Sequence, residues 1–260
     1  MEREIIEIRP EDMIKRSKLS PGSERALEKS GLAESYKAPE YESEENRLKL
    51  VGILIDDSRS IETAGNREIM IEKHNSIIDA LKLTKEVADI LLRTQYLNGF
   101  VLNDWNLVFD ALKMDKRNYS TDNATPLYDS TVNLLGNLVV ETRAAKDRGQ
   151  TSQFNLLIVS DGADTSSTKN SASDVKSLVT DIFVDNHQLR PNTIAFMGLD
   201  DGETDYMKIA NEMGIDDTRV NKKGEKIMQI ITPNDSPTSI RRAFDTWTKW
   251  NVQSHGYYKK

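Results

Sequence analysis

Four short, almost uninterrupted apolar runs constrain the fold of this 260-residue chain more than any other feature. They span Leu48–Ile55, Phe154–Ser160, Thr193–Leu199 and Ile227–Thr232, and aspartates follow the first two. A strand that is covered on both faces has this pattern, because it lacks the alternation of apolar and polar residues seen in a solvent-facing strand. The runs therefore predict four strands of a buried, parallel sheet.

Helical patterns lie between these runs, with apolar residues at spacings of three and four. We expect helices over residues 66–83, 126–148, 173–185, 204–214 and 236–252. Pro126 suits the first position of its helix, and Gly214 suits a C-terminal cap. Strands that alternate with helices predict an α/β fold with a doubly wound, Rossmann-like sheet and helices on both faces.

One pair of strands is expected to depart from the parallel arrangement. The apolar segments Ile90–Tyr96 and Phe100–Trp105 flank Asn98 and Gly99. An Asn-Gly pair between apolar segments is the strongest short-range signal for a β-hairpin. We therefore predict a mostly parallel six-stranded sheet with one antiparallel strand at its edge.

The pattern divides the chain into an α/β domain over residues 48–252, a polar N-terminal arm or linker over residues 1–47, and a tail over residues 253–260. Within the arm, helices are expected near Glu11–Lys18 and Ser23–Lys29, and a polar linker over Glu34–Asn46. The apolar segments of the arm are too small to form a core of their own. The sequence leaves open whether the arm packs on the domain or docks a partner.

Composition excludes several classes of function. The chain has no cysteine, which excludes disulfides, thiolate zinc sites and cysteine nucleophiles. Its 35 basic and 42 acidic side chains give a net charge of −7, which argues against nucleic acid as a partner. It has no apolar run long enough for a membrane span and no Gly-rich phosphate loop. The first ten residues lack the pattern of a secretory signal, so we expect a cytoplasmic protein.

Oxygen-bearing side chains gather at the ends of the predicted strands. The first run is followed by Asp56, Ser58 and Ser60, the second by Asp161, and Thr125 precedes the longest expected helix. Carboxyl ends of parallel strands meet at one edge of the sheet, where doubly wound folds bind ligands, so we expect the five residues to converge. Two carboxylates and three hydroxyls are hard ligands that suit Mg²⁺, Mn²⁺ or Ca²⁺.

These motifs resemble those of a von Willebrand factor type A (vWA) domain with a complete metal-ion-dependent adhesion site (MIDAS). The resemblance covers about residues 48–252 and rests on Asp56-x-Ser58-x-Ser60, on the segment that begins at Thr125, and on the turn Ser160-Asp161-Gly162. It implies that Ser58, Ser60 and Thr125 contact the ion directly, while Asp56 and Asp161 act through bound water. An ion held in this way stays under-neutralised and favours an anionic ligand from a partner.

The resemblance implies an intracellular protein-interaction module rather than an enzyme. Such a module binds Mg²⁺ and grips a Glu or Asp side chain of a partner protein, as an adaptor or assembly factor beside an AAA+ ATPase or a kinase or phosphatase system. Arg59 stands where the family often has Gly, and it either pairs with a second partner carboxylate or is an exposed loop residue.

Two other functions stay open. One is a structural subunit that docks through residues 1–47, with the metal incidental. The other is a Mg²⁺-dependent phosphohydrolase that uses Asp56, for which the sequence places no general acid or base. Among the neighbouring residues, Asp57 and Asp164 are expected to hydrogen-bond their own loops. His74 shares no metal-ligand spacing with other histidines and is expected to be solvated on its helix.

Overall fold

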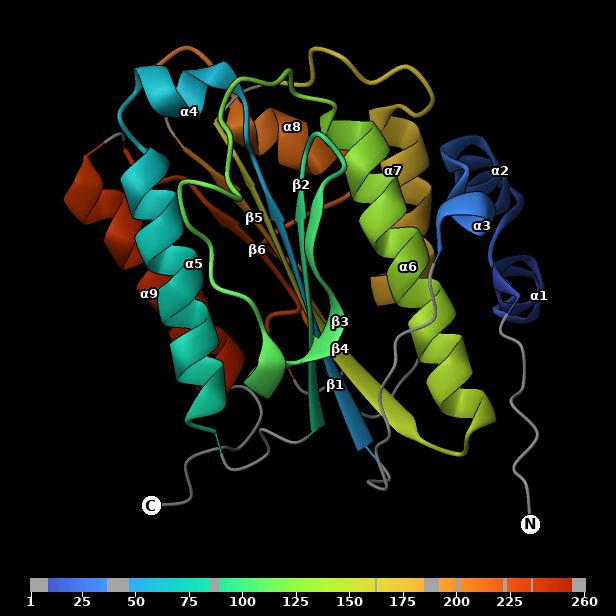
Figure 1. Ribbon diagram of the computed structural model, residues 1–260. Coiled ribbons are helices and arrows are strands. Elements are labelled where there is room, and N and C mark those ends of the chain that lie inside the picture. The colour runs from blue at the N-terminus through green and yellow to red at the C-terminus, as the bar shows by residue number, and fades with distance from the viewer. Residues whose placement is uncertain are drawn as a thin grey trace.

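A computed structural model of the protein describes residues 9–36, 47–84, 89–161, 163–184, 192–199, 202–221, 224–234 and 236–253. A six-stranded sheet lies between two helical layers (Figure 1). Its strands are β1 (Arg47–Ile55), β2 (Ile90–Tyr96), β3 (Val101–Leu107), β4 (Thr151–Ser160), β5 (Thr193–Gly198) and β6 (Met228–Ile231). This arrangement confirms the predicted α/β fold.

The strand order is β3-β2-β1-β4-β5-β6, with β2 and β3 antiparallel and every other pair parallel. The antiparallel strand β3 therefore lies at the edge, as the Asn-Gly turn predicts, and Gly99 has the positive φ of 93° that such turns require. Crossovers lead from β1 to β2 on one side and from β4 to β5 on the other. The order therefore reverses between β1 and β4, and a switch point of this kind leaves a crevice at the carboxyl ends of the two strands.

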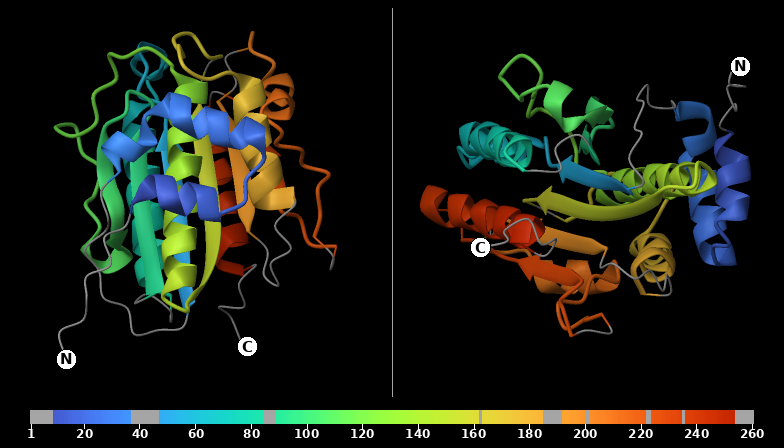
Figure 2. Two further views of the ribbon diagram at one scale, coloured as in Figure 1. Left: turned by 90° about the vertical axis from the view of Figure 1, so that its right-hand side faces the viewer. Right: turned by 90° about the horizontal axis from the view of Figure 1, so that it is seen from below.

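Helices cover both faces of the sheet (Figure 2). One face packs against α4 (Arg59–Thr63), α5 (Arg67–Lys82) and α9 (Pro237–Gln253), and the other against α6 (Leu127–Asp147), α7 (Ala172–Val179) and α8 (Tyr206–Glu212). The short helix η2 (Val108–Asp110) follows β3, and the π-helix η3 (Thr180–Val184) continues α7. The sequence did not predict α4, because five residues are too few to show an apolar period. None of the helices in these ranges is both long and apolar enough to cross a lipid bilayer.

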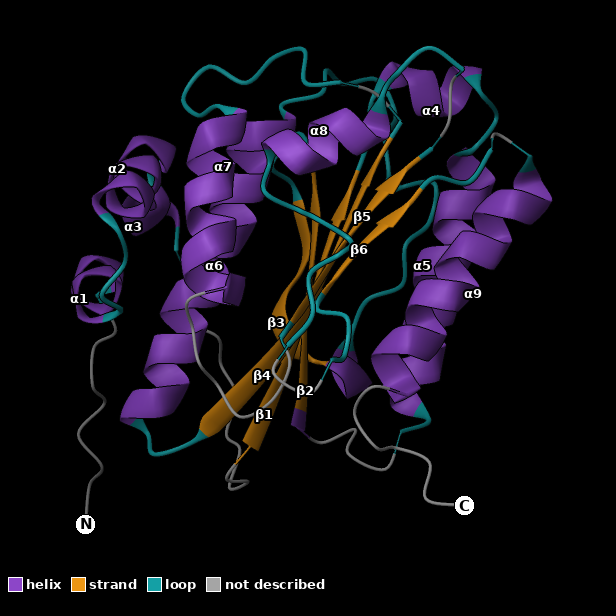
Figure 3. Ribbon diagram, turned by 180° about the vertical axis from the view of Figure 1, so that it is seen from behind, coloured by secondary structure: helices purple, strands orange, loops and turns teal. Residues whose placement is uncertain are grey.

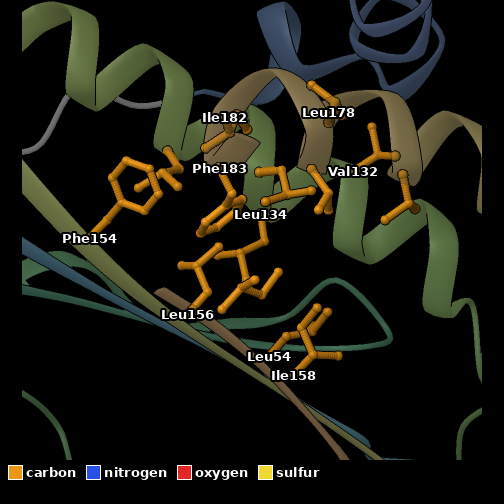
Figure 4. Packing of buried hydrophobic residues seen from close by; sticks show 14 of the residues in the cluster. Leu54, Val132, Leu134, Phe154, Leu156, Ile158, Leu178, Ile182 and Phe183 are labelled. Carbon is orange, nitrogen blue, oxygen red and sulfur yellow. The ribbon is translucent and has the colours of Figure 1, made fainter. Parts of the chain in front are cut away.

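Each face of the sheet contributes to its own apolar cluster. Leu54 and Ile158 point toward α6 and α7 (Figure 4), whereas their neighbours Ile53 and Leu157 belong to the cluster on the α5 and α9 side. All four side chains are fully buried. Burial of such a side chain stabilises the fold by about 1.5–3 kcal/mol. Because both faces are covered, β1 and β4 have the continuous apolar pattern that predicts the sheet.

Residues 9–36 form three helices on the outer side of α6 and α7 (Figure 3). They are α1 (Pro10–Arg16), α2 (Pro21–Ser30) and α3 (Leu32–Ser35). The side chains of Ala26, Leu27 and Leu32 are buried and extend the apolar cluster of α6 and α7. Residues 37–46 of the expected linker and residues 254–260 of the expected tail lie outside the described residues.

The prediction that His74 is solvated is wrong. Its side chain is fully buried, with Nε2 2.9 Å from Thr94 Oγ1 and Nδ1 3.2 Å from Asn75 Oδ1. Burial lowers its pKa to about 4. The physical reason is that α5 lies against both the sheet and α9, so more than one face of this helix is covered.

Candidate metal centre

Four of the five oxygen-bearing residues that the sequence singles out come together at the carboxyl ends of β1 and β4. Ser58 Oγ lies 2.8 Å from Ser60 Oγ, and both hydroxyls donate to Asp161 Oδ1, at 3.1 and 2.9 Å. On the other side of the crevice, Ser160 Oγ donates to Asp56 Oδ2 at 2.8 Å. The loops that follow two adjacent parallel strands therefore bring two serines and two aspartates together.

Asp56 is held from several directions and has no solvent exposure. Its Oδ1 accepts a hydrogen bond from Ser58 N at 2.8 Å, and its Oδ2 accepts from Ser160 Oγ at 2.8 Å and from Asp161 N at 3.3 Å. The Tyr119 hydroxyl donates to the backbone carbonyl of Asp56. A carboxylate whose two oxygens both have neighbouring donors fixes the shape of the loop.

The loop that carries Thr125 is attached to the end of β1 by backbone hydrogen bonds. Arg59 N donates to Asn123 O at 3.2 Å, within a parallel bridge between Ser58 and Asn123. Thr125 follows two residues later and is 6% exposed, and its backbone N–H donates to Thr165 Oγ1 at 3.2 Å. No hydrogen bond joins its hydroxyl to the other four residues in the part of the chain that the structure describes. Within the described residues, Thr125 is thus tied to the same loops as the serine–aspartate cluster but is not hydrogen-bonded to it.

Asp164 hydrogen-bonds its own loop as predicted, whereas Asp57 bonds to two other loops. Asp57 accepts from Asn98 N at 3.1 Å and from Asn123 Nδ2 at 2.8 Å, which ties the β2–β3 turn and the Thr125 loop to the end of β1. Burial raises the pKa of Asp57 to about 6. Asp164 accepts from Ser167 Oγ at 2.5 Å within its own turn.

The donor set fits a hard divalent cation. Burial, followed by the charge of Asp56, raises the pKa of Asp161, because two carboxylates share a crevice with little access to water. A cation beside them would offset their repulsion, and oxygen donors suit Mg²⁺, Mn²⁺ or Ca²⁺. The described residues contain no group of three or more His, Cys, Asp or Glu side chains placed to hold a metal, so an ion at this edge would depend on the hydroxyls.

Ser60 and Arg59 lie on the exposed rim of the crevice. The Arg59 side chain is 77% exposed, and its Nε lies 3.4 Å from Oδ1 of the equally exposed Asp122. A carboxylate of a partner would therefore compete with Asp122 for this guanidinium. Exposed ion pairs of this kind are worth about 0–1 kcal/mol, so such competition would be easy.

The sequence analysis missed the residues that position the loop between β3 and α6. Asn103 of β3 exchanges two hydrogen bonds with the backbone of Leu112, at 2.8 and 3.1 Å. Asn75 of α5 makes the same pair with Met114, at 2.8 and 2.9 Å. Each carboxamide thus pairs with the backbone N–H and C=O of one loop residue, as a neighbouring strand would. No local motif signals these contacts, because Asn75 and Met114 are 39 residues apart.

No family model matches the chain, and no curated protein matches it. Among solved structures, proximal thread matrix protein 1 from the mussel byssus is similar with a TM-score of 0.50 and 11% identity, over 78% of this chain and 48% of that one. The pilus adhesin SpaC from Lactobacillus rhamnosus GG, in its open conformation, gives 0.45 and 10%, over 80% of this chain and 30% of the adhesin. The chain thus spans about half the length of the mussel protein and less than a third of the adhesin. The similarity to the mussel protein shows the fold alone, and the protein has a vWA-like α/β fold.

Proposed function

We propose that the protein is a metal-dependent interaction module, in which a MIDAS-type crevice binds Mg²⁺ and the ion binds a Glu or Asp side chain of a partner protein. The observation that carries this proposal is the convergence of the Ser58 and Ser60 hydroxyls on Asp161, beside the buried Asp56. The cluster lies at the switch point of the sheet, where doubly wound folds bind ligands.

The chemistry of the five residues suggests how such a site would work. Ser58, Ser60 and Thr125 would hold the ion through neutral oxygens, while Asp56 and Asp161 would balance part of its charge from behind. The bound ion would supply the positive charge that attracts a carboxylate. Mn²⁺ and Ca²⁺ suit the same donors, and Mg²⁺ is the ion we favour.

Binding is favoured over catalysis by the character of the neighbouring groups. In the described ranges, no histidine or lysine hydrogen-bonds to the carboxylates or hydroxyls of the cluster, so neither residue type is placed there to act as a general acid or base. Burial of Ala26, Leu27 and Leu32 against α6 and α7 favours the metal face over the arm as the partner site. An adaptor or assembly role in the cytoplasm, beside an AAA+ ATPase or a kinase or phosphatase system, follows from the family resemblance.

Calorimetric titration of the metal-free protein with Mg²⁺, Mn²⁺ and Ca²⁺ tests the metal site. We expect one site per chain, and a loss of affinity of about tenfold or more in Asp161→Ala and Thr125→Ala. Ser76→Ala is the matched control, because the one hydrogen bond of this exposed serine's hydroxyl among the described residues is to Glu72 O of its own helix. Equal affinities in all four proteins would contradict the proposal.

Affinity purification from the native cell, in Mg²⁺ and after chelation, tests the partner. A protein that is retained only with Mg²⁺, and is lost with Thr125→Ala but kept with Ser76→Ala, would support the proposal. A partner set that is indifferent to chelation and to Thr125→Ala would favour the alternative function, a structural subunit that docks through residues 1–47.

A further inference from the structure

A second candidate site lies between the N-terminal arm and helix α6. It is an open cavity of about 970 Å³, lined by residues 15–20, the second half of α6, Phe154 of β4 and the start of η3. Helix α6 begins near the carboxyl ends of β1 and β4 and runs toward their opposite ends (Figure 1). The second half of α6 lines the cavity, so the cavity is separate from the cluster described above. Its size is in the range of small-molecule sites, about 300–1,000 Å³.

Positive charge dominates the lining. Only one acid of the described residues, Asp181, lines the cavity, against five cations: Lys15, Arg16, Lys18, Arg143 and Lys146. Just outside, Asp147 pairs with both arginines, at 2.9 Å from Arg16 Nη1 and 3.0 Å from Arg143 Nη2. The three lysines form no ion pair within the described ranges. A chain with a net charge of −7 thus concentrates unbalanced positive charge around one cavity.

The single acid in the lining is stabilised by a backbone N–H group at a helix N-terminus, which shows that negative charge is favoured at this wall of the cavity. Asp181 Oδ2 accepts a hydrogen bond from Ser20 N at 2.7 Å, at the start of α2, where the helix dipole favours negative charge. Asp181 belongs to the π-helix η3, and π-helical turns are frequent at functional sites. Thr142 Oγ1 and Arg143 Nε, on the α6 side, are buried without a hydrogen-bond partner among the described residues.

The apolar part of the lining limits what else the cavity can bind. Leu138, Phe154 and Ile182 are at most 4% exposed, while Leu19 is partly exposed, so apolar atoms share the lining with the charged groups. Among the described residues that line the cavity, no aromatic ring is exposed for a base to stack on. We infer that the cavity binds a small polyanion, a molecule that carries two or more phosphate or carboxylate groups.

Such a ligand would connect two parts of the molecule. Lys15 and Lys18 come from the arm and Lys146 from α6, so one polyanion that contacts all three fastens the arm to the domain. The ligand would therefore slow amide hydrogen exchange in α1 as well as in the second half of α6. This effect would occur without metal and is independent of the proposed interaction module.

Calorimetric titration with pyrophosphate, ATP and citrate tests the inference. Metal is removed beforehand on a chelating resin, because a soluble chelator is itself a polyanion and bound metal would attract the probes to the crevice. We expect at least one probe to bind, with a loss of about tenfold or more in the triple variant K15Q/K18Q/K146Q. Binding of the phosphates alone identifies a phosphate ligand, and binding of citrate alone identifies a polycarboxylate.

The matched control is K116Q/K208Q/K249Q, which removes the same charge at three exposed lysines outside the cavity. Control affinity should stay within about twofold of the parent protein, since distant exposed charges are screened. The single variant K146Q, with a smaller loss, keeps the test valid if thermal unfolding shows that the triple variant is misfolded. No binding of any probe, or equal losses in the cavity and control variants, would overturn the inference.

Discussion

The side chain of Glu141, on α6, is a buried acid, with 1% of the residue's surface exposed. Its Oε1 accepts a hydrogen bond from the Tyr36 hydroxyl at the end of the arm, while its Oε2 has no hydrogen-bond partner among the described residues. Burial raises its pKa to about 7. In the unfolded chain a glutamate titrates near 4.3, so the folded protein binds this proton more tightly than the unfolded chain does.

We expect the stability that this proton provides to be complete below about pH 4 and to be lost as the pH rises through about 7. Glu141→Gln keeps an oxygen for Tyr36 and carries no charge. It should therefore be more stable than the parent above pH 7, by up to about 3 kcal/mol, and should lack this part of the pH dependence. Urea unfolding at pH 5 and pH 8 measures both effects. Glu72→Gln, at an exposed glutamate paired with Arg241, is the control, and an identical pH dependence in Glu141→Gln and the parent would contradict the argument.

At the scale of elements, Leu27 and Leu32 of the arm pack directly against Gly136 of α6. A Cβ at Gly136 would lie 2.6 Å from the Cδ2 atoms of both Leu27 and Leu32. Helix propensity alone favours alanine over glycine by about 1 kcal/mol. We nevertheless expect Gly136→Ala to destabilise the protein by about 1–3 kcal/mol, because the added methyl overpacks this contact.

A double-mutant cycle distinguishes this packing effect from a general one. Leu27→Ala makes room for the methyl, so G136A combined with L27A should be destabilised by less than the sum of the two changes, with a coupling of about 1 kcal/mol. Ile240→Ala, in α9 on the opposite face of the sheet, should be additive with G136A. Stabilisation by G136A, or additivity with L27A, would show that the arm does not pack here as described.

The loop between β3 and α6 depends on the carboxamide of Asn103. Asn103→Ala leaves the backbone N–H and C=O of Leu112 without these bonds, and we expect a loss of about 1–3 kcal/mol in stability. Hydrogen exchange over residues 111–125 should become faster, since the loop loses this attachment to the sheet. Asn106→Ala is the control, because this exposed residue of the same strand accepts only from Asp104 N. Equal exchange rates in the two variants would argue against the attachment.

These elements show which features the sequence could predict. β1 and β4 are covered on both faces, so each has a continuous apolar run, and the convergence of Asp56, Ser58 and Asp161 follows from parallel pairing in register. Long-range contacts leave no such pattern. The buried side chain of His74 contacts Thr94 of β2, and the hydrogen bonds of Asn103 depend on a loop that follows β3, so neither is signalled by its sequence neighbours.

For the whole molecule, the position of the candidate site would make metal binding a property of the entire fold. Four of the five candidate ligands follow β1 and β4, the two central strands, and they separate when the sheet unfolds. An ion that binds only the folded form stabilises it by RT ln(1 + [L]/Kd). At Mg²⁺ concentrations ten- to a hundredfold above Kd, this is about 1.4–2.7 kcal/mol.

We therefore expect Mg²⁺ to raise the midpoint of thermal unfolding, by about 2–4 °C for each kcal/mol in a domain of this size. Ser60→Ala should abolish the rise, because it removes a hydroxyl from the cluster at Asp161, whereas Ser76→Ala should retain it. Amide exchange in β1 and β4 should slow together with the rise, since both strands end at the site. An equal rise in Ser60→Ala would mean that the stabilising Mg²⁺ binds elsewhere, and an unchanged midpoint in the parent protein would mean that the folded form does not bind Mg²⁺ at these concentrations. Either result would contradict the proposed site and leave the hydroxyl cluster only joining the two loops.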